Sequence, residues 1–305
     1  MDTAEDVTHF SSVDRTKEPG FFKRFLDEGN KLPGIIASKP IILAGLKLTG
    51  GEKVLDAGCG LGDDTFEIAR LVGSQGRAVG IDVSETMILE ARRRAATLDL
   101  SAEFEVGDAQ ALRFEDATFD ACRTERMLMH VPDAERAFAE MVRVIRRGGR
   151  LSVFDFDWET QIVDSPYTET TRLITRSFCN NFQNGWIGRR LPRLFKQHGM
   201  TDVSIAPQTI ILNYPFLELL LGGHLTRAQQ AGVVSSADAE RWWTHLREAH
   251  EAGTFIYAIT ALIVAGAKSC ECETRQSEKK SFFAVFLRSL RRFPSRLTHA
   301  ADFSA

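Results

Sequence analysis

An apolar, strand-like segment runs directly into a glycine-rich turn between residues 53 and 63. The turn has glycine at every second position, Gly58, Gly60 and Gly62, and two carboxylates follow it at Asp63 and Asp64. Glycine lets the backbone turn tightly and lets a ligand approach the main chain without interference from a Cβ atom. Because a predicted helix starts right after the turn, the pattern indicates a ligand-binding turn at a helix N-terminus.

The spacing of the glycines excludes two common phosphate sites. A dinucleotide fingerprint, G-x-G-x-x-G, would need glycine at position 63, where the chain has aspartate. A P-loop would need Gly-Lys-Ser or Gly-Lys-Thr after the turn, and neither follows. Two carboxylates at the start of a helix would also repel a pyrophosphate. We therefore expect a nucleoside-like ligand that is not anionic at this end.

Two further acidic residues follow predicted strands. Asp82 lies 24 residues after Gly58 and ends one strand, where it can accept hydrogen bonds from two ribose hydroxyls. Its alternative role is to cap the next helix, although Ser84 can fill that role instead. Asp108 can accept the exocyclic amine of adenine while the N–H of Ala109 meets a ring nitrogen, or it can simply form a turn.

These motifs, in this order, resemble the class I S-adenosylmethionine (SAM)-dependent methyltransferases, and most closely the small-molecule branch that includes the menaquinone and ubiquinone C-methyltransferases. The ordered motifs cover roughly residues 35–157 and end with a helix that leads into Gly148 and Gly149. The resemblance implies SAM as the cofactor. It also implies a cofactor-binding set, which consists of Asp56, Gly58, Gly60, Gly62, Asp82, Val83, Met87, Asp108, Ala109 and Glu125.

Candidate catalytic residues follow the fourth and fifth predicted strands. Methyl transfer from a sulfonium is an in-line displacement that depends mainly on positioning, and it needs a base only when the nucleophile must lose a proton. His130 is the first candidate, as a base or as a substrate contact, and its alternative role is to cap the next helix. Asp157 is the second candidate, and it points to the same side of its strand as Asp155. We expect no metal, since Cys270 and Cys272 are too few for a zinc site.

Strands and helices alternate from residue 53 onward, which is typical of a parallel sheet built from βαβ units. We expect an α/β, Rossmann-like fold with a seven-stranded, mostly parallel sheet and flanking helices. The resemblance to the methyltransferases implies that the last strand runs antiparallel between the fifth and sixth, and the pattern places a helical insert between strands six and seven. The predicted strands are 53–57, 77–81, 103–106, 119–123, 150–156, 203–212 and 254–265, and the predicted helices are 64–72, 84–98, 133–146, 167–182, 191–198, 215–232 and 237–250.

Three domains are expected along the chain. Residues 1–48 form an N-terminal helical cap, in which 1–20 are a mobile leader and the helix over 35–48 is interrupted at Pro40. Residues 49–268 form the methyltransferase domain, with the insert at about 214–250. Residues 269–305 form a basic, disordered tail with seven Lys or Arg against four Asp or Glu. The tail could instead contact an anionic membrane weakly through an amphipathic helix.

Aromatic residues in the cap and in the later helices can enclose a hydrophobic acceptor pocket, as such segments do in relatives, or can simply pack on the sheet. Trp186 and Arg189 could clamp an aromatic or acidic substrate, or could stack on each other as ordinary surface groups. The residues proposed for the pocket wall are Phe21, Phe22, Trp186, Phe216, Leu220, Trp242 and Trp243.

Composition narrows the class of partner. The chain of 305 residues carries 38 Lys and Arg against 41 Asp and Glu, a net charge of −3, which does not suit a nucleic-acid binder. The motifs of nucleic-acid amino-methylating enzymes (Asn/Asp-Pro-Pro-aromatic) and of cytosine enzymes (Pro-Cys) are missing. Five cysteines without a disulfide framework, and no secretory signal, predict a cytoplasmic protein.

The function that these features predict is SAM-dependent transfer of a methyl group to O, N or C of a small, apolar or aromatic metabolite. The alternative is a non-catalytic protein of the same fold that binds SAM or another nucleoside. The sequence leaves the oligomeric state and the identity of the acceptor open.

Overall fold

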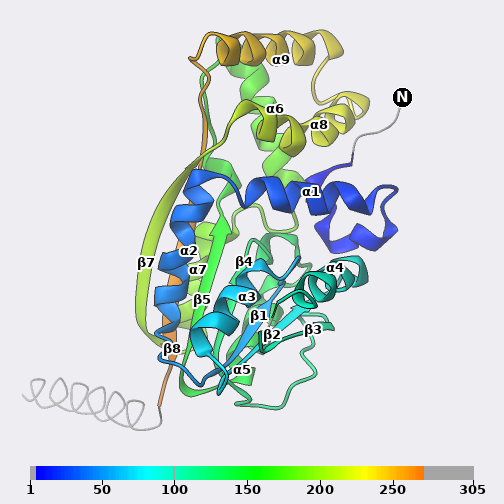
Figure 1. Ribbon diagram of the computed structural model, residues 1–305. Coiled ribbons are helices and arrows are strands. Elements are labelled where there is room, and N and C mark those ends of the chain that lie inside the picture. Colours follow the sequence, from blue (N-terminus) through cyan, green and yellow to red (C-terminus); the bar gives the residue numbers. More distant parts are fainter. Residues whose placement is uncertain (1–4, 99, 271–305) are drawn as a thin grey trace, which may run out of the picture. The chain divides into compact units, whose positions relative to one another are not determined.

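The structure is a computed structural model, and it describes residues 5–98 and 100–270. An eight-stranded sheet forms the centre of the fold within these residues (Figure 1). The strand order is β3-β2-β1-β4-β5-β8-β6, and β7 pairs with β8. The strands are β1 (Lys53–Ala57), β2 (Arg77–Asp82), β3 (Ala102–Val106), β4 (Phe119–Glu125), β5 (Ile145–Phe156), β6 (Ile162–Val163), β7 (Met200–Ile211) and β8 (Tyr257–Lys268).

The predicted sheet is confirmed in its main features. Strands β3, β2, β1, β4 and β5 are parallel neighbours, and β8 runs antiparallel between β5 and β7. The predicted number of seven strands is wrong by one, because β6 adds a short pairing of Val163 with Tyr257. A strand of two residues is too short to produce an alternating pattern in the sequence.

Helices α3 (Asp63–Val72), α4 (Glu85–Ala95) and α5 (Ala134–Val144) connect the parallel strands. Asp133 caps α5 by accepting the N–H of Arg136, as predicted. The predicted end of this helix at Arg146 is wrong, because the helix ends at Val144 and β5 begins at the next residue. Gly149 lies inside β5. A side chain does not fit at this position, because a Cβ atom would collide with the carbonyl oxygen of Asp120.

Residues expected to form a mobile leader are folded instead. A 3₁₀ helix, η1, spans Val7–Arg15, and residues 1–4 lie outside the described part of the chain. The Asp14 carboxylate accepts hydrogen bonds from the Ser84 hydroxyl at 2.7 Å and from the N–H of Glu85 at 2.8 Å. The polar residues of this segment therefore find partners far away in the sequence, and composition alone gave no sign of them.

Helices α1 (Pro19–Gly29) and α2 (Pro33–Leu46) follow η1. The interruption predicted at Pro40 is wrong, because α2 continues through it. Proline leaves the carbonyl four residues earlier without a helical partner. That carbonyl belongs to Ile36, a residue that is 56% exposed on the surface of the helix.

The predicted helical insert is confirmed. Helices α8 (Tyr214–Gln230) and α9 (Ser236–Glu251) lie between β7 and β8 in sequence and pack with α6 (Thr168–Asn181) (Figure 1). Helix α7 (Ile187–Gln197) packs against β5, β7 and β8. Among the described residues, no helix is long and apolar enough to cross a membrane. The predicted tail lies outside the described residues from 271 onward, so its contact with a membrane stays a prediction.

Candidate functional site

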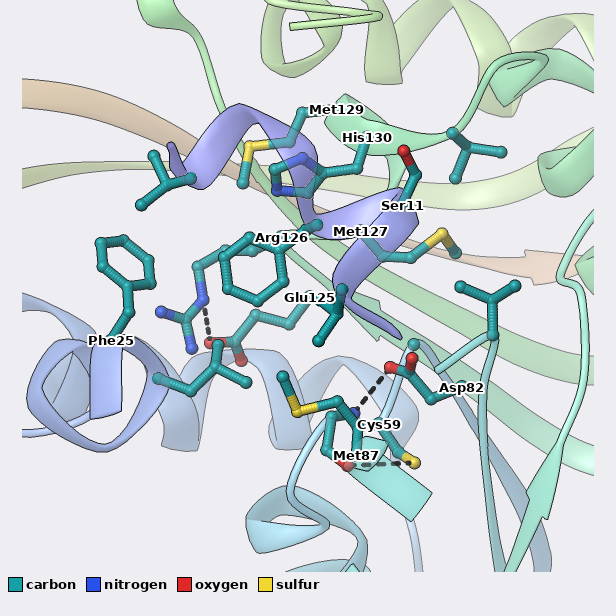
Figure 2. Close-up of a pocket in the computed structure, with 18 of the residues that line it drawn as sticks. Ser11, Phe25, Cys59, Asp82, Met87, Glu125, Arg126, Met127, Met129 and His130 are labelled. Carbon is teal, nitrogen blue, oxygen red and sulfur yellow. Dashed lines mark hydrogen bonds and ion pairs between the residues drawn. The ribbon is translucent and has the colours of Figure 1, made fainter. Parts of the chain in front are cut away.

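A cavity of about 410 Å³ lies at the carboxyl ends of β1, β2, β3 and β4, and residues of η1, α1 and α8 are among those that line it. Figure 2 shows Asp82 and Met87 on one side of it and His130 and Met129 on another, with Glu125 between them. The predicted site residues that line it are Gly58, Gly60, Asp82, Val83, Met87, Asp108, Ala109, Glu125 and His130. Three predicted residues are not part of this lining, and they are Asp56, Gly62 and Asp157.

The glycine turn forms one wall of the cavity. Gly58 and Gly60 have φ values of +74° and +51°, a left-handed region that favours glycine. The N–H of Gly60 donates to Asp82 at 3.0 Å, so the turn is tied to the end of β2. A Cβ atom at Gly60 would lie 3.1 Å from Leu26 of α1. A Cβ atom at Gly58 would lie 2.5 Å from Met127, so both glycines let neighbouring side chains pack directly against the main chain of the turn.

Gly62 ends the glycine turn at the start of α3 and packs against Phe104 of β3. It caps α3 with φ of +87°, and a Cβ atom there would lie 2.8 Å from the ring of Phe104. We expect Gly62→Ala to lower the free energy of unfolding by about 1–3 kcal/mol, through backbone strain and overpacking together. Gly73→Ala is the matched control in urea denaturation, since Gly73 has φ of +67° with open space around it. Equal losses in the two variants would show that Phe104 yields to the added methyl group.

Asp82 lies where a ribose acceptor is expected. Its Oδ2 accepts the N–H of Gly60, and its Oδ1 accepts the N–H of Ser84 at 2.9 Å. Desolvation of the carboxylate, with smaller contributions from Asp14 and Asp56, raises the pKa of Asp82 to about 6. Ser84 caps α4 itself, which leaves Asp82 available for a ligand.

The adenine end of the predicted site is also assembled. Met87 is buried on the first turn of α4 and lines the cavity, and Asp108 and Ala109 line it from the turn after β3. Asp108 accepts hydrogen bonds from the backbone and the side chain of Gln110, so it forms the turn that was its alternative role. The turn itself still faces the cavity.

A buried ionic cluster lies beneath the glycine turn, formed by Lys39, Asp56, Asp64, Arg123 and Glu125. Arg123 is 3.0 Å from Asp56, 3.0 Å from Asp64 and 2.5 Å from Glu125. Lys39 is 2.6 Å from Asp64 and 2.8 Å from Glu125. Burial opposes ionisation, but the Arg123 and Lys39 charges hold the pKa of Asp64 well below its usual value. Asp56 therefore anchors Arg123 rather than touching the cavity.

His130 lies in a short 3₁₀ turn, η2 (Leu128–His130), between the rings of Phe10 and Phe182 at 5.2 and 5.3 Å. Its burial and the charge of Arg126 lower the pKa of His130 to about 3. The imidazole is therefore neutral near pH 7. Its Nδ1 has no hydrogen-bond partner within the described residues.

Asp157 is held away from the cavity by an ion pair with Arg189. Asp155, two residues earlier, is fully buried and accepts the N–H groups of Phe156 and Met129. Burial raises the pKa of Asp155 to about 7. Asp155 thus holds the turn that carries His130, while Asp157 caps the short η3 (Trp158–Thr160).

Most of the proposed pocket wall packs elsewhere. Arg189 stacks over Trp186 at 5.0 Å, and the Trp186 indole donates to Glu159, so this pair is satisfied within the chain. Of the seven aromatic and aliphatic residues proposed, only Phe216 and Leu220 line the cavity. Among the described residues, no group of three or more His, Cys, Asp or Glu could hold a metal ion.

Comparison with known proteins places this geometry in a family. The family model described as a methyltransferase domain matches residues 48–199. A demethylmenaquinone methyltransferase of Bacillus cereus (strain B4264) is 30% identical over 175 residues, which are 52% of this chain and 74% of that protein. This chain belongs to the SAM-dependent methyltransferases. The predicted family is confirmed, and the methyltransferase uses SAM as its cofactor to methylate a small molecule.

Other matches vary in extent. An uncharacterized 37.1 kDa protein in transposon TN4556 of Streptomyces fradiae is 36% identical, over 79% of this methyltransferase and 69% of that protein. Three further curated relatives are matched over less than half of their own length. The YcgJ protein of Bacillus subtilis is similar in fold, with a TM-score of 0.56 at 18% identity, over 77% of this chain and 99% of that chain.

Several cavity residues of the methyltransferase were missed in the sequence. Phe10 and Val13 line the cavity from the segment that was expected to be a leader. Arg123 and Arg126, which line the cavity, were also missed, as was Lys39 of the ionic cluster, although one signal pointed to Arg123. Charged residues within the apolar run of a central strand must be paired, and the pairing of Arg123 follows from that rule.

Proposed function

We propose that this methyltransferase holds adenosine against Asp82, Met87 and Asp108, and holds the methionine part of SAM along the glycine turn. The remaining, apolar part of the cavity then receives the methyl acceptor. The observation that carries this proposal is one continuous cavity that joins a ribose-type carboxylate to an aromatic chamber. When bound, SAM supplies a methyl group on a sulfonium sulfur, which the acceptor atom takes as the sulfur–methyl bond breaks.

The residues present fit this cofactor. Gly58 and Gly60 line the cavity with main chain alone, and Asp82 presents a carboxylate to which two hydroxyls can donate. The oxygens of Glu125 reach the cavity beside the turn, where an ammonium group can donate to them. The same residues would not suit a pyrophosphate, since Asp63 and Asp64 begin the helix after the turn.

The acceptor chamber is mainly apolar. Its polar groups are few, and they include Ser11, Asn30, Arg126 and His130. Such a chamber excludes water and orients a ligand through a small number of polar contacts. The apolar residues that line it include Phe10, Val13, Phe25, Met129, Phe156, Trp158, Phe182, Phe216, Leu220 and Ile259.

His130 acts in this proposal as an acceptor contact rather than as a general base. A group with a pKa of about 3 holds a proton poorly at neutral pH. Its neutral imidazole lines the cavity, where it can instead form a hydrogen bond with the acceptor molecule. The rate then comes from holding acceptor, methyl group and sulfur in line.

The test is formation of S-adenosylhomocysteine (SAH) from SAM on addition of a small-molecule extract of cells. We expect turnover with the wild type, and His130→Ala should lower it by roughly 3- to 10-fold, the worth of one hydrogen bond. SAH affinity should stay unchanged in His130→Ala. The control is His250→Ala, on the exposed end of α9.

Two outcomes would contradict this part of the proposal. SAH binding without turnover in any extract would favour the non-catalytic alternative. An unaltered rate in His130→Ala would remove His130 from the acceptor contacts.

A further inference from the structure

Arg126 has an unusual backbone conformation at the edge of the cavity. It directly follows β4 and has φ of +54°, in the left-handed region that residues other than glycine rarely adopt. Its N–H is still bonded to the carbonyl of Phe154 at 2.8 Å, so the strand pairing persists through the residue. Such backbone strain clusters at ligand sites, where the surrounding structure maintains it. Here it accompanies a side chain that lines the cavity (Figure 2).

The guanidinium of Arg126 is held in place by its neighbours but does not use all of its hydrogen-bond donors. Its Nη2 donates to Asn30 Oδ1 at 2.6 Å, and its Nε lies 3.1 Å from Glu125 Oε1. Asn30 is fixed in turn by its own hydrogen bond to Asp63 at 3.0 Å. Within the described residues, neither Nε nor Nη1 makes a hydrogen bond. The side chain is only 13% exposed, so these donors have little access to water.

The carboxylates around Arg126 do not fully neutralise its positive charge, so an anion could still pair with it. Glu125 is shared by Lys39, Arg123 and Arg126, so no carboxylate is dedicated to Arg126. With Asp56 and Asp64, the group contains three cations and three carboxylates. SAM adds a net charge of +1, from a sulfonium, an ammonium and a carboxylate. In an apolar chamber the attraction between opposite charges is strong, so an acidic oxygen of the acceptor that is bonded to Arg126 would be favoured there.

Arg126 lies toward the apolar chamber rather than toward the adenosine end. A Cβ atom on Gly29 would touch both the Arg126 Nη1 and the ring of Phe216, each at 3.3 Å, so those two groups are neighbours. Figure 2 shows Phe25 beside Arg126, with Asp82 and Met87 on the far side of Glu125. A group bound by Arg126 would therefore be part of a molecule that lies among these aromatic rings.

We infer that the acceptor has an apolar body and an acidic oxygen, such as a carboxylate, phenolate or enolate, and that Arg126 binds this oxygen. The inference rests on the proposed function and names the substrate class of the same chamber. Arg126 and Asn30 then set both the orientation of the acceptor and the preference for acids over neutral molecules. The methionine carboxylate of SAM is the other possible source of an anionic oxygen, and the experiment separates the two.

The test uses two fluorescent probes on one ring system, with the full chain saturated with SAH. Anilinonaphthalene sulfonate carries an anionic group, and phenylnaphthylamine lacks it. We expect the wild type to bind the sulfonate at least about tenfold more tightly than the neutral probe, as charge-assisted hydrogen bonds imply. Arg126→Met should remove this preference, and Arg126→Lys should retain part of it. The control is Arg241→Met, an exposed arginine on α9.

Each outcome decides between the possibilities. Equal affinity of the two probes for the wild type, or an unchanged preference in Arg126→Met, would overturn the inference. Binding of neither probe to the SAH-loaded wild type would overturn it too, since it would deny the apolar chamber. If Arg126→Met weakens SAH binding itself tenfold or more, Arg126 holds the cofactor carboxylate and the inference is wrong. Failure of the wild type to bind SAH would instead contradict the proposed function.

Discussion

Replacement of Asp82 by asparagine is expected to weaken SAH binding by about 10- to 100-fold at pH 7. The variant keeps the size of the side chain but loses the charge that strengthens hydrogen bonds from two ribose hydroxyls. Isothermal titration calorimetry on the full chain measures the effect. The control is Asp157→Asn, since Asp157 also follows a strand but is ion-paired with Arg189 outside the cavity lining. Unchanged affinity in Asp82→Asn would show that the ribose lies elsewhere.

The same carboxylate should make cofactor affinity depend on pH. The pKa of Asp82 is raised to about 6 in the free protein, and hydroxyl donors bind better to the ionised form. Affinity for SAH should therefore rise with pH, by about tenfold between pH 5 and pH 7, and level off above that range. In Asp82→Asn this dependence should disappear.

The free energy of unfolding should depend on the ionisation of Asp82 in the opposite direction to the cofactor affinity. A carboxyl group whose pKa is higher in the folded state than in the unfolded chain binds its proton more tightly when folded. The contribution of Asp82 to the free energy of unfolding of the cofactor-free protein therefore falls as pH rises from about 4 to about 6. The two effects differ in sign, so they can be told apart. If the affinity for SAH fell as pH rose from about 4 to about 6, the proposed role of Asp82 as the ribose acceptor would be wrong.

Replacement of Arg123 by methionine is expected to lower the free energy of unfolding by about 3–5 kcal/mol, as measured by urea denaturation at pH 7. Arg123 is 2% exposed and pairs with Asp56, Asp64 and Glu125. Without it, these buried carboxylates keep only Lys39 and Arg126 as counter-charges. Uncompensated charge in a dry interior is costly, and methionine fills only the space of the lost side chain.

Arg77→Met is the matched control for this variant. Arg77 also lies on a strand, and it pairs with a single carboxylate, that of Glu103. Both of these side chains are 47% exposed. Exposed pairs contribute less than about 1 kcal/mol, because water screens them. If Arg123→Met cost no more than Arg77→Met, the carboxylates around position 123 would be protonated or hydrated rather than dependent on the arginine.

The parts of the site that follow local rules could be predicted from the sequence. Gly58, Gly60, Asp82 and Asp108 lie directly at strand ends, and parallel strands bring their carboxyl ends to one edge of the sheet. The order of the elements therefore fixes where these residues meet. The antiparallel direction of the last strand was expected from the resemblance to the methyltransferases, not from a local pattern in the sequence.

The parts that depend on distant contacts could not be predicted. The first turn of the chain looked mobile because its partners, Ser84 and Arg227, lie far away in the sequence. Pro40 looked like a helix break because its place on the helix, one turn after the exposed Ile36, is a property of the tertiary fold. The left-handed backbone of Arg126 has no signature in its neighbours along the chain, and its N–H is bonded to Phe154 of β5, far away in the sequence.

The hydrogen bonds of Asp14 link two tasks that are far apart along the chain. The carboxylate that fastens η1 also caps α4, whose first residues follow Asp82 by three positions. A protein that began after Arg15 would thus lose Phe10 and Val13 from the chamber and weaken the helix start beside Asp82 in one step. Residues 5–15 are for this reason better regarded as a working part of the enzyme than as a segment that a shortened version could omit.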